Sequence, residues 1–101
     1  MVDFTNPDAR VWIKNVIKDN LVKEGRAGGW MHDFGEYMPF DAVLHDGTDA
    51  FVYHNKYADE WQAVCQEAMD EVEQGYEIVW FSRSGSTMTP GHARLMWMGD
   101  Q

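Results

Sequence analysis

The chain has 101 residues and a formal net charge of −9, from 17 acidic and 8 basic side chains. This length suits one small domain with a modest core, and it is too short to close an eight-stranded α/β barrel, which needs roughly 200–250 residues. The acidic balance, without a cluster of basic residues, argues against nucleic acid and anionic membranes as partners.

The cysteine content and the N-terminus bear on the cellular compartment. Cys65 is the only cysteine, so no internal disulfide can form, and its place on an apolar helix face predicts a buried, structural thiol. The first ten residues lack a basic region followed by an apolar run, and no apolar stretch approaches the roughly 20 residues of a membrane span. We therefore expect a cytoplasmic protein, an expectation that holds only if this N-terminus is the natural one.

The first third of the chain predicts a helix after a short apolar stub at residues 2–4, which could end a strand. Asn6 suits the N-cap and Pro7 the first helical position. The helix is expected to run to about Lys23, with Gly25 at its C-terminal end. Its apolar face recurs every three or four residues at Ala9, Trp12, Ile13, Val16, Ile17 and Leu21.

A glycine-bounded segment at residues 28–33 predicts a short buried strand that ends at Asp33. Residues 34–56 predict a loop of more than twenty residues, and long ordered loops in compact domains are usually functional. A second helix is predicted over residues 58–72, with Gly75 after its end. Its apolar positions are Ala58, Trp61, Cys65, Ala68 and Val72.

The last quarter predicts two further strands joined by a loop. Residues 78–81 form a continuous apolar run, typical of a strand covered on both faces in a parallel sheet. A loop at 84–92 precedes the apolar residues 95–98. The alternation of strands and helices predicts an α/β fold with a parallel sheet. Asp33 and Asp100 would then both follow strand C-terminal ends, the edge where such folds place their chemistry.

Two carboxylates at such an edge fit the hydrolysis of glycosides. One would attack the anomeric carbon or activate water, and the other would protonate the leaving oxygen. In a chain with 17 acidic residues, solvated loop carboxylates remain an alternative interpretation. A metal cluster built from His32, Asp33, Glu36 and His45 is not predicted, because these residues lack a recognised ligand spacing.

Specific segments carry a family resemblance. Residues 29–39, GWMHDFGEYMP, resemble the nucleophile segment of glycoside hydrolase family 31, and the DFGEY form is closest to its sulfoquinovosidase branch. Residues 96–101, MWMGDQ, resemble the acid/base segment of the same branch. The DFTNP sequence at 3–7, His54-Asn55 and the FSRS sequence at 81–84 also match, in the order of the family. The resemblance therefore covers essentially the whole chain.

The resemblance implies a fold and site residues. It implies part of a TIM (β/α)8 barrel, about three strand–helix units, with residues 1–101 a fragment of the catalytic barrel that is incomplete at both ends. It implies Asp33 as the nucleophile and Asp100 as the general acid/base, about 5–5.5 Å apart, in a retaining double displacement without metal or cofactor. His32 receives no role. The residues implied in sugar binding or beside the nucleophile are Arg83, Trp97 and Glu36.

The implied substrate is a small α-glycoside. α-Sulfoquinovosides are preferred, with α-glucosides and α-xylosides as alternatives, because the segments that grip the sulfonate lie outside residues 1–101. No activity is expected from the 101-residue chain alone. Two hypotheses from other classes remain open: a small non-catalytic α/β interaction module, and a carbohydrate-binding remnant that has lost turnover.

Overall fold

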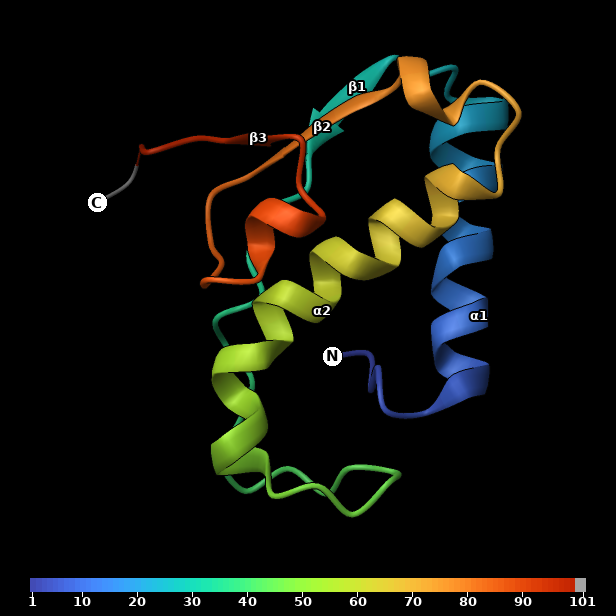
Figure 1. The fold of residues 1–101 in the computed structure, drawn as a ribbon. Coiled ribbons are helices and arrows are strands. Elements are labelled where there is room, and N and C mark those ends of the chain that lie inside the picture. Colours follow the sequence, from blue (N-terminus) through green and yellow to red (C-terminus); the bar gives the residue numbers. More distant parts are fainter. Residues whose placement is uncertain (100–101) are drawn as a thin grey trace.

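A computed structural model describes residues 1–99 of the chain, so the predicted acid/base residue Asp100 lies outside the described residues. None of the helices within this range combines the length and the apolar character that a membrane crossing requires. Figure 1 shows the helices and strands in chain order. The main elements are α1 (Pro7–Val16), a π-helical continuation (Ile17–Glu24), β1 (Gly29–Met31), α2 (Ala50–Asp70), β2 (Val79–Ser82) and β3 (Leu95–Met96), with single 3₁₀ turns at Gly75–Glu77 and Thr89–Gly91.

The three strands form one parallel sheet in the order β1-β2-β3. Trp30 of β1 pairs with Trp80 of β2, and Phe81 of β2 pairs with Leu95 of β3. Helix α2 makes the connection from β1 to β2, as parallel neighbours require a crossover. The predicted α/β class with a parallel sheet is therefore confirmed, and its sequential strand order is that of a partial α/β barrel.

The described residues cover only one of the two faces of the sheet. Trp80 and Ser82 of β2 are 0% exposed, and Trp80 belongs to the same apolar cluster as Cys65 of α2. Val79 and Leu95, which point to the opposite face, are 47% and 54% exposed. The expectation that residues 78–81 are covered on both faces is therefore wrong for residues 1–99, which supply a single covering layer.

Helix α2 begins at Ala50, eight residues before the predicted start, so the long loop is shorter than expected. Asp49 is the N-cap, and its carboxylate accepts a hydrogen bond from the backbone N–H of Phe51 at 2.8 Å. Phe51 and Val52 are 69% and 58% exposed. The first turn therefore breaks the apolar periodicity from which the helix was predicted.

The start of α1 is confirmed, and its end differs in detail. The Asn6 side chain accepts hydrogen bonds from the backbone N–H groups of Asp8 and Ala9. Beyond Val16 the helix widens, and the Gly25 N–H donates to the carbonyl of Asn20, five residues earlier. Gly25 caps this end with ordinary helical dihedrals, and Arg26 takes the left-handed conformation, with φ of 49°.

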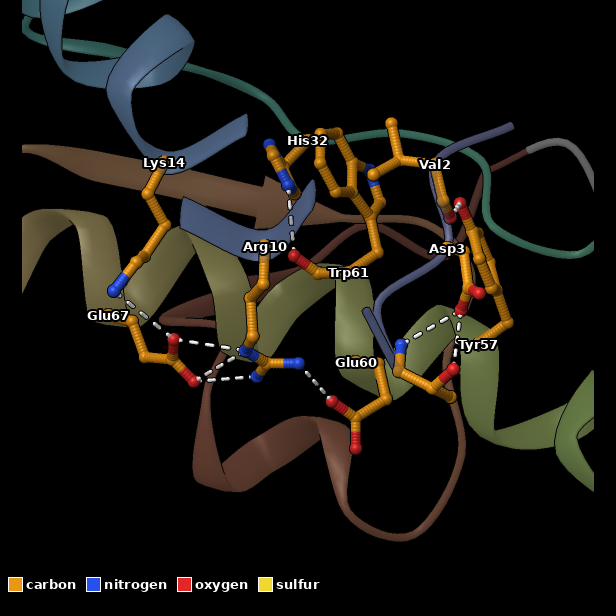
Figure 2. A network of polar contacts seen from close by, with 10 residues as sticks. Val2, Asp3, Arg10, Lys14, His32, Tyr57, Glu60, Trp61 and Glu67 are labelled. Atoms are coloured by element: carbon orange, nitrogen blue, oxygen red, sulfur yellow. Dashed lines mark hydrogen bonds and ion pairs between the residues drawn. The ribbon is translucent and has the colours of Figure 1, made fainter. Parts of the chain in front are cut away.

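The N-terminal stub is not a strand in the structure; it packs on α2. The ring of Phe4 stacks on Tyr57 at 4.7 Å and lies 5.7 Å from Trp61 between centroids. The Tyr57 hydroxyl donates to the carbonyl of Val2 at 2.8 Å, as Figure 2 shows. The apolar side chains of the stub are thus part of the core, and burial raises the pKa of Tyr57 to about 12.

Charged residues on the outer faces tie α1 to α2. The Arg10 guanidinium binds Glu67 with two nitrogens, at 2.6 Å and 3.1 Å, and Glu60 at 2.7 Å (Figure 2). Lys14 pairs with Glu71 at 2.6 Å. A bidentate arginine–carboxylate pair has a preferred planar geometry, so this network fixes the register between the two helices as well as their contact.

The open sheet face predicts self-association of the isolated 101-residue chain. The exposed Val79 and Leu95 side chains and the free strand edges should bind a hydrophobic dye and promote association. Replacing Val79 and Leu95 by Thr places a β-branched, more polar residue at both strand positions and should lower both dye binding and apparent mass in light scattering. Trp80→Ala is the control, because loss of this buried indole should abolish folding. A chain that is monomeric and binds no dye would contradict the one-sided sheet.

Candidate active site

Residues from two strand ends meet at the carboxyl edge of the sheet. Asp33 lies two residues after β1, and Arg83 directly follows β2. The Arg83 Nε donates to the Asp33 Oδ1 at 2.9 Å, and the Arg83 Nη2 donates to the Glu36 Oε1. Because β1 and β2 are parallel neighbours, side chains fifty positions apart in sequence become hydrogen-bond partners. The structure therefore brings together three of the five predicted site residues.

The site is a partly shielded group of one cation and two carboxylates. The side chains of Arg83, Asp33 and Glu36 are 14%, 21% and 33% exposed. Burial acts to raise the pKa of Glu36, but hydrogen bonds from Arg83, from its own backbone and from Ser84, with the Arg83 charge, together outweigh burial, and the net pKa lies below the usual value. The contacts of Arg83, that with Glu36 first, raise the pKa of Arg83. Glu36 is therefore a carboxylate that holds the Arg83 cation beside Asp33.

A tight turn after Asp33 makes this geometry possible. Phe34 has φ of 65° and Gly35 has φ of 108°, so the backbone reverses and Glu36 returns toward Arg83. A Cβ on Gly35 would lie 2.9 Å from the Cα of Ala58 in α2. The Ser84 hydroxyl donates to the carbonyl of Phe34, which closes the turn against the loop that follows β2. A left-handed phenylalanine is rare, and such strain clusters at functional sites.

Helix α2 holds the backbone of the segment that contains Asp33. The Trp61 indole Nε1 donates to the carbonyl of Asp33 at 3.0 Å. The Gln62 amide Nε2 donates to the carbonyl of His32 at 2.8 Å, and Gln62 is fully buried. Two consecutive helical residues thus satisfy two consecutive carbonyls beyond the end of β1. These two hydrogen bonds fix the backbone at Asp33 to helix α2.

His32, to which no role was assigned, is a buried part of this support. It is 3% exposed, and its ring stacks on Trp61 with centroids 3.7 Å apart. Its Nδ1 accepts from the Trp30 indole at 3.1 Å, so the proton sits on Nε2, which donates to the Trp61 carbonyl at 3.1 Å (Figure 2). Burial lowers the pKa of His32 to about 4. Trp30 and His32 lie two positions apart where the chain leaves β1, and the alternation of side chains in extended backbone is the signal that both face α2.

The remaining predicted residues lie elsewhere or outside the described range. Trp97 directly follows β3 and is 43% exposed, and its backbone N–H donates to the carbonyl of Ser82 at 2.8 Å. It therefore lies on the same edge, one strand beyond Arg83. Asp100 is outside the described residues. Within residues 1–99 no group of three or more His, Cys, Asp or Glu side chains could hold a metal ion.

An open hollow of about 420 Å³ lies beside Asp33. Its walls come from the N-terminal stub, the turn after Asp33 and the first half of α2. Aromatic side chains form much of the lining, and those of Phe34 and Tyr37, at 54% and 67% exposed, offer apolar area on which a sugar ring can stack. The aromatic lining residues are Phe4, Phe34, Tyr37, Tyr57 and Trp61.

Comparison with known proteins identifies a family match. The profile of the glycosyl hydrolases family 31 TIM-barrel domain matches residues 1–101. The chain is 46% identical over 101 residues to the sulfoquinovosidase of Escherichia coli strain K12 and 39% identical over 102 residues to that of Agrobacterium fabrum strain C58. Each match covers 100% of this chain and 15% of the relative, so the chain spans a small part of their length.

A solved structure agrees with these relatives. A GH31 family sulfoquinovosidase from E. rectale, in complex with the aza-sugar inhibitor IFGSQ, superimposes with a TM-score of 0.91 at 37% sequence identity. The superposition covers 98% of this chain and 15% of that protein. The arrangement of strands and helices described above is therefore the one this enzyme uses within its longer chain.

Substitution of Gly35 should test the tight turn. Gly35→Ala combines a positive φ with a Cβ 2.9 Å from the Ala58 backbone, and it should cost about 1–3 kcal/mol of unfolding free energy. Gly47→Ala is the matched control, because Gly47 has φ of 78° but open space where its Cβ would lie. Urea unfolding of both variants gives the comparison. Equal losses in the two variants would show that the approach to α2 is unimportant.

The pH dependence of stability should reveal the neutral His32. Its pKa is about 4 in the folded state against about 6.5 in the unfolded state, so the unfolded state binds more protons in between. The contribution of neutral His32 to the free energy of unfolding is fully present above pH ~6.5. It is lost as the pH falls toward ~4, by up to about 1.4 kcal/mol per pH unit. His32→Phe should flatten the urea-unfolding profile in that window.

Gly47→Ala provides the control for this measurement, because it leaves every titratable side chain in place. It should keep the wild-type slope between pH ~4 and ~6.5, the folded and unfolded pKa values of His32. An unchanged slope in His32→Phe would mean that His32 does not titrate in the way its hydrogen bonds require.

Proposed function

Because the chain belongs to glycosyl hydrolase family 31, we propose that it carries the nucleophile side of the active site of a retaining α-glycoside hydrolase. Asp33 is the nucleophile and Asp100 the general acid/base. The observation that carries this proposal is the Asp33 carboxylate at the carboxyl edge of a parallel sheet, hydrogen-bonded by Arg83 at 2.9 Å. Family resemblance supplies the pairing with Asp100.

The chemistry is a double displacement. An ionised Asp33 oxygen forms a bond to the anomeric carbon as the bond to the leaving oxygen breaks, and Asp100 gives its proton to that oxygen. Asp100 then takes a proton from water, which attacks the same carbon and releases Asp33, so the anomeric configuration is retained. The Arg83 Nε holds the Asp33 carboxylate through its hydrogen bond, and Glu36 keeps Arg83 in position.

The sugar-binding roles follow the same residues. Arg83 lies beside Asp33 at the edge of the sheet where the sugar would bind, and a guanidinium donates well to sugar hydroxyls. Trp97, on the same edge, lines the subsite with an aromatic face. We assign α-sulfoquinovosides as the substrates, because the two bacterial relatives reported above are named sulfoquinovosidases. The alternative substrates are α-glucosides and α-xylosides.

Residues 1–101 are proposed to be a fragment of a larger catalytic barrel that is incomplete at both ends. The one-sided sheet supports this, because the exposed Val79 and Leu95 face the side that a closed barrel fills with its own interior. The short coverage of the relatives supports it as well. The isolated chain is therefore expected to have no turnover.

A segment exchange tests the role of Asp33. Residues 1–101 replace the matching segment of the E. coli sulfoquinovosidase, and the folded chimera should hydrolyse an aryl α-sulfoquinovoside with retention, followed by NMR of the released sugar. Asp33→Asn should lower kcat by a factor of about 10³ or more, because it removes the nucleophile. Asp41→Asn, in an exposed loop position, is the control and should leave kcat unchanged.

Three results would contradict the proposal: a folded chimera without activity, inversion of configuration, or full activity in Asp33→Asn. A sugar-binding remnant would instead show inhibitor binding without turnover, unaffected by Asp33→Ala. Substrate choice is measured separately, as the ratio of kcat/KM for aryl α-sulfoquinovoside, α-glucoside and α-xyloside in the full-length protein, since the sulfonate contacts lie outside this segment.

A further inference from the structure

A buried carboxylate on α2 anchors the loop that follows Arg83. Asp59 is 7% exposed and faces the segment after β2. Its Oδ1 accepts from the backbone N–H of Ser86 at 3.0 Å and from the hydroxyl of Thr89, and its Oδ2 accepts from the hydroxyl of Ser86. Thr89 is fully buried. Three donors from one loop thus converge on a single carboxylate that no part of the proposed reaction uses.

The carboxylate is held in its charged form. Burial acts to raise the pKa of Asp59, but the hydrogen bonds from Ser86 and Thr89 outweigh it and lower the pKa below its usual value. Hydrogen bonds to an ionised acceptor are roughly twice as strong as neutral ones. The anchor is therefore stronger than a serine–asparagine contact at the same place would be.

The anchored loop has little freedom between Arg83 and Ser86. The Ser82 hydroxyl donates to the Ser84 carbonyl, and the Ser84 hydroxyl donates to the Phe34 carbonyl. Gly85 packs so closely on Thr89 that a Cβ there would overlap the Thr89 side chain. Arg83 thus lies between two fixed points of the chain: β2, which ends at Ser82, and Ser86, which is bound to Asp59.

We propose that Asp59 is a positioning residue for Arg83: by fixing the loop at Ser86 and Thr89 to α2, it sets the place of the guanidinium beside Asp33 and Glu36. The proposal rests on the function proposed above, in which Arg83 takes part in glycoside hydrolysis beside Asp33. Helix α2 then positions both Arg83 and Asp33, because Trp61 and Gln62 of the same helix donate hydrogen bonds to the carbonyls of Asp33 and His32.

Single substitutions in the active full-length protein give the first test. Asp59→Ala should lower kcat/KM by roughly 10–100-fold, the scale expected for a small misplacement of a binding group. Asp59→Asn keeps an oxygen acceptor for the Ser86 N–H and gains an N–H for a hydroxyl, and it should stay within about threefold of wild type. Glu67→Ala removes an acidic partner from the same helix without touching the loop, and it should lose stability but not kcat/KM.

A double-mutant cycle separates positioning from general damage to the fold. If Asp59 acts through Arg83, Asp59→Ala should cost about twofold or less when Arg83 is already Ala. An equal cost in both backgrounds would overturn the proposal, and so would wild-type kcat/KM in Asp59→Ala. Should Asp59→Ala fail to fold, Ser86→Ala removes one donor and enters the same cycle, with a smaller loss expected in the wild-type background only.

Hydrogen exchange distinguishes this inference from the function on which it rests. In Asp59→Ala the peptide spanning residues 82–89 should exchange faster than in wild type and Glu67→Ala, whether or not any glycoside is cleaved. An inactive wild-type protein with this pattern would refute the proposed function and keep the anchor. Unchanged exchange at 82–89 would refute the anchor whatever the activity.

Discussion

One turn of α2 supports both halves of the candidate site. Asp59, Trp61 and Gln62 hydrogen-bond respectively to the loop after β2, to the Asp33 carbonyl and to the His32 carbonyl. These bonds satisfy backbone groups of the segments that follow β1 and β2. The 2.9 Å contact between Arg83 and Asp33 is therefore positioned by a helix and not by the loops alone. Side chains that are supported by a rigid element keep a fixed geometry better than side chains on unsupported loops.

The site bears local costs of kinds that also occur elsewhere among residues 1–99, at the left-handed Arg26 and at the buried Trp80 Nε1 without a hydrogen-bond partner. Phe34 adopts a left-handed conformation, and among the described residues the buried atoms without a hydrogen-bond partner include Glu36 Oε2 and Gln62 Oε1. A buried unpaired polar atom costs about 1–3 kcal/mol. Both atoms belong to the side chains that hold Arg83 or the His32 carbonyl. Natural proteins tolerate such violations chiefly at functional positions, which agrees with the place of these residues beside Asp33.

The ionic contacts divide into two groups with different physical roles. Between α1 and α2, Arg10 and Lys14 meet glutamates near solvent, where ion pairs contribute little individually and serve mainly to fix helix register. At the sheet edge Arg83 lies between two carboxylates under partial burial, where screening by water is weaker. The same kind of pair thus fixes the contact between two helices in one place and holds the side chains of the candidate site together in the other.

Local signals in the sequence determined the elements and several core residues. The Asn6 cap, the apolar periodicity of both helices and the run at 78–81 depend on near neighbours, and they correctly placed Cys65 and Trp80 in the core. The motifs around Asp33 and Arg83 identified the family, because its chemistry fixes residue types in order along the chain. These features need no knowledge of what packs against them.

Only the tertiary structure decided the start of α2, the open face of the sheet and the supporting roles of His32 and Asp59. Phe51 and Val52 are apolar and exposed, so the first turn of α2 carried no periodic signal. His32 and Asp59 act through hydrogen bonds to residues 27 to 30 positions away, and no local pattern encodes a partner at that separation. Which polar side chain is buried and satisfied depends on the packing of helix against sheet, and that is settled only when the chain has folded.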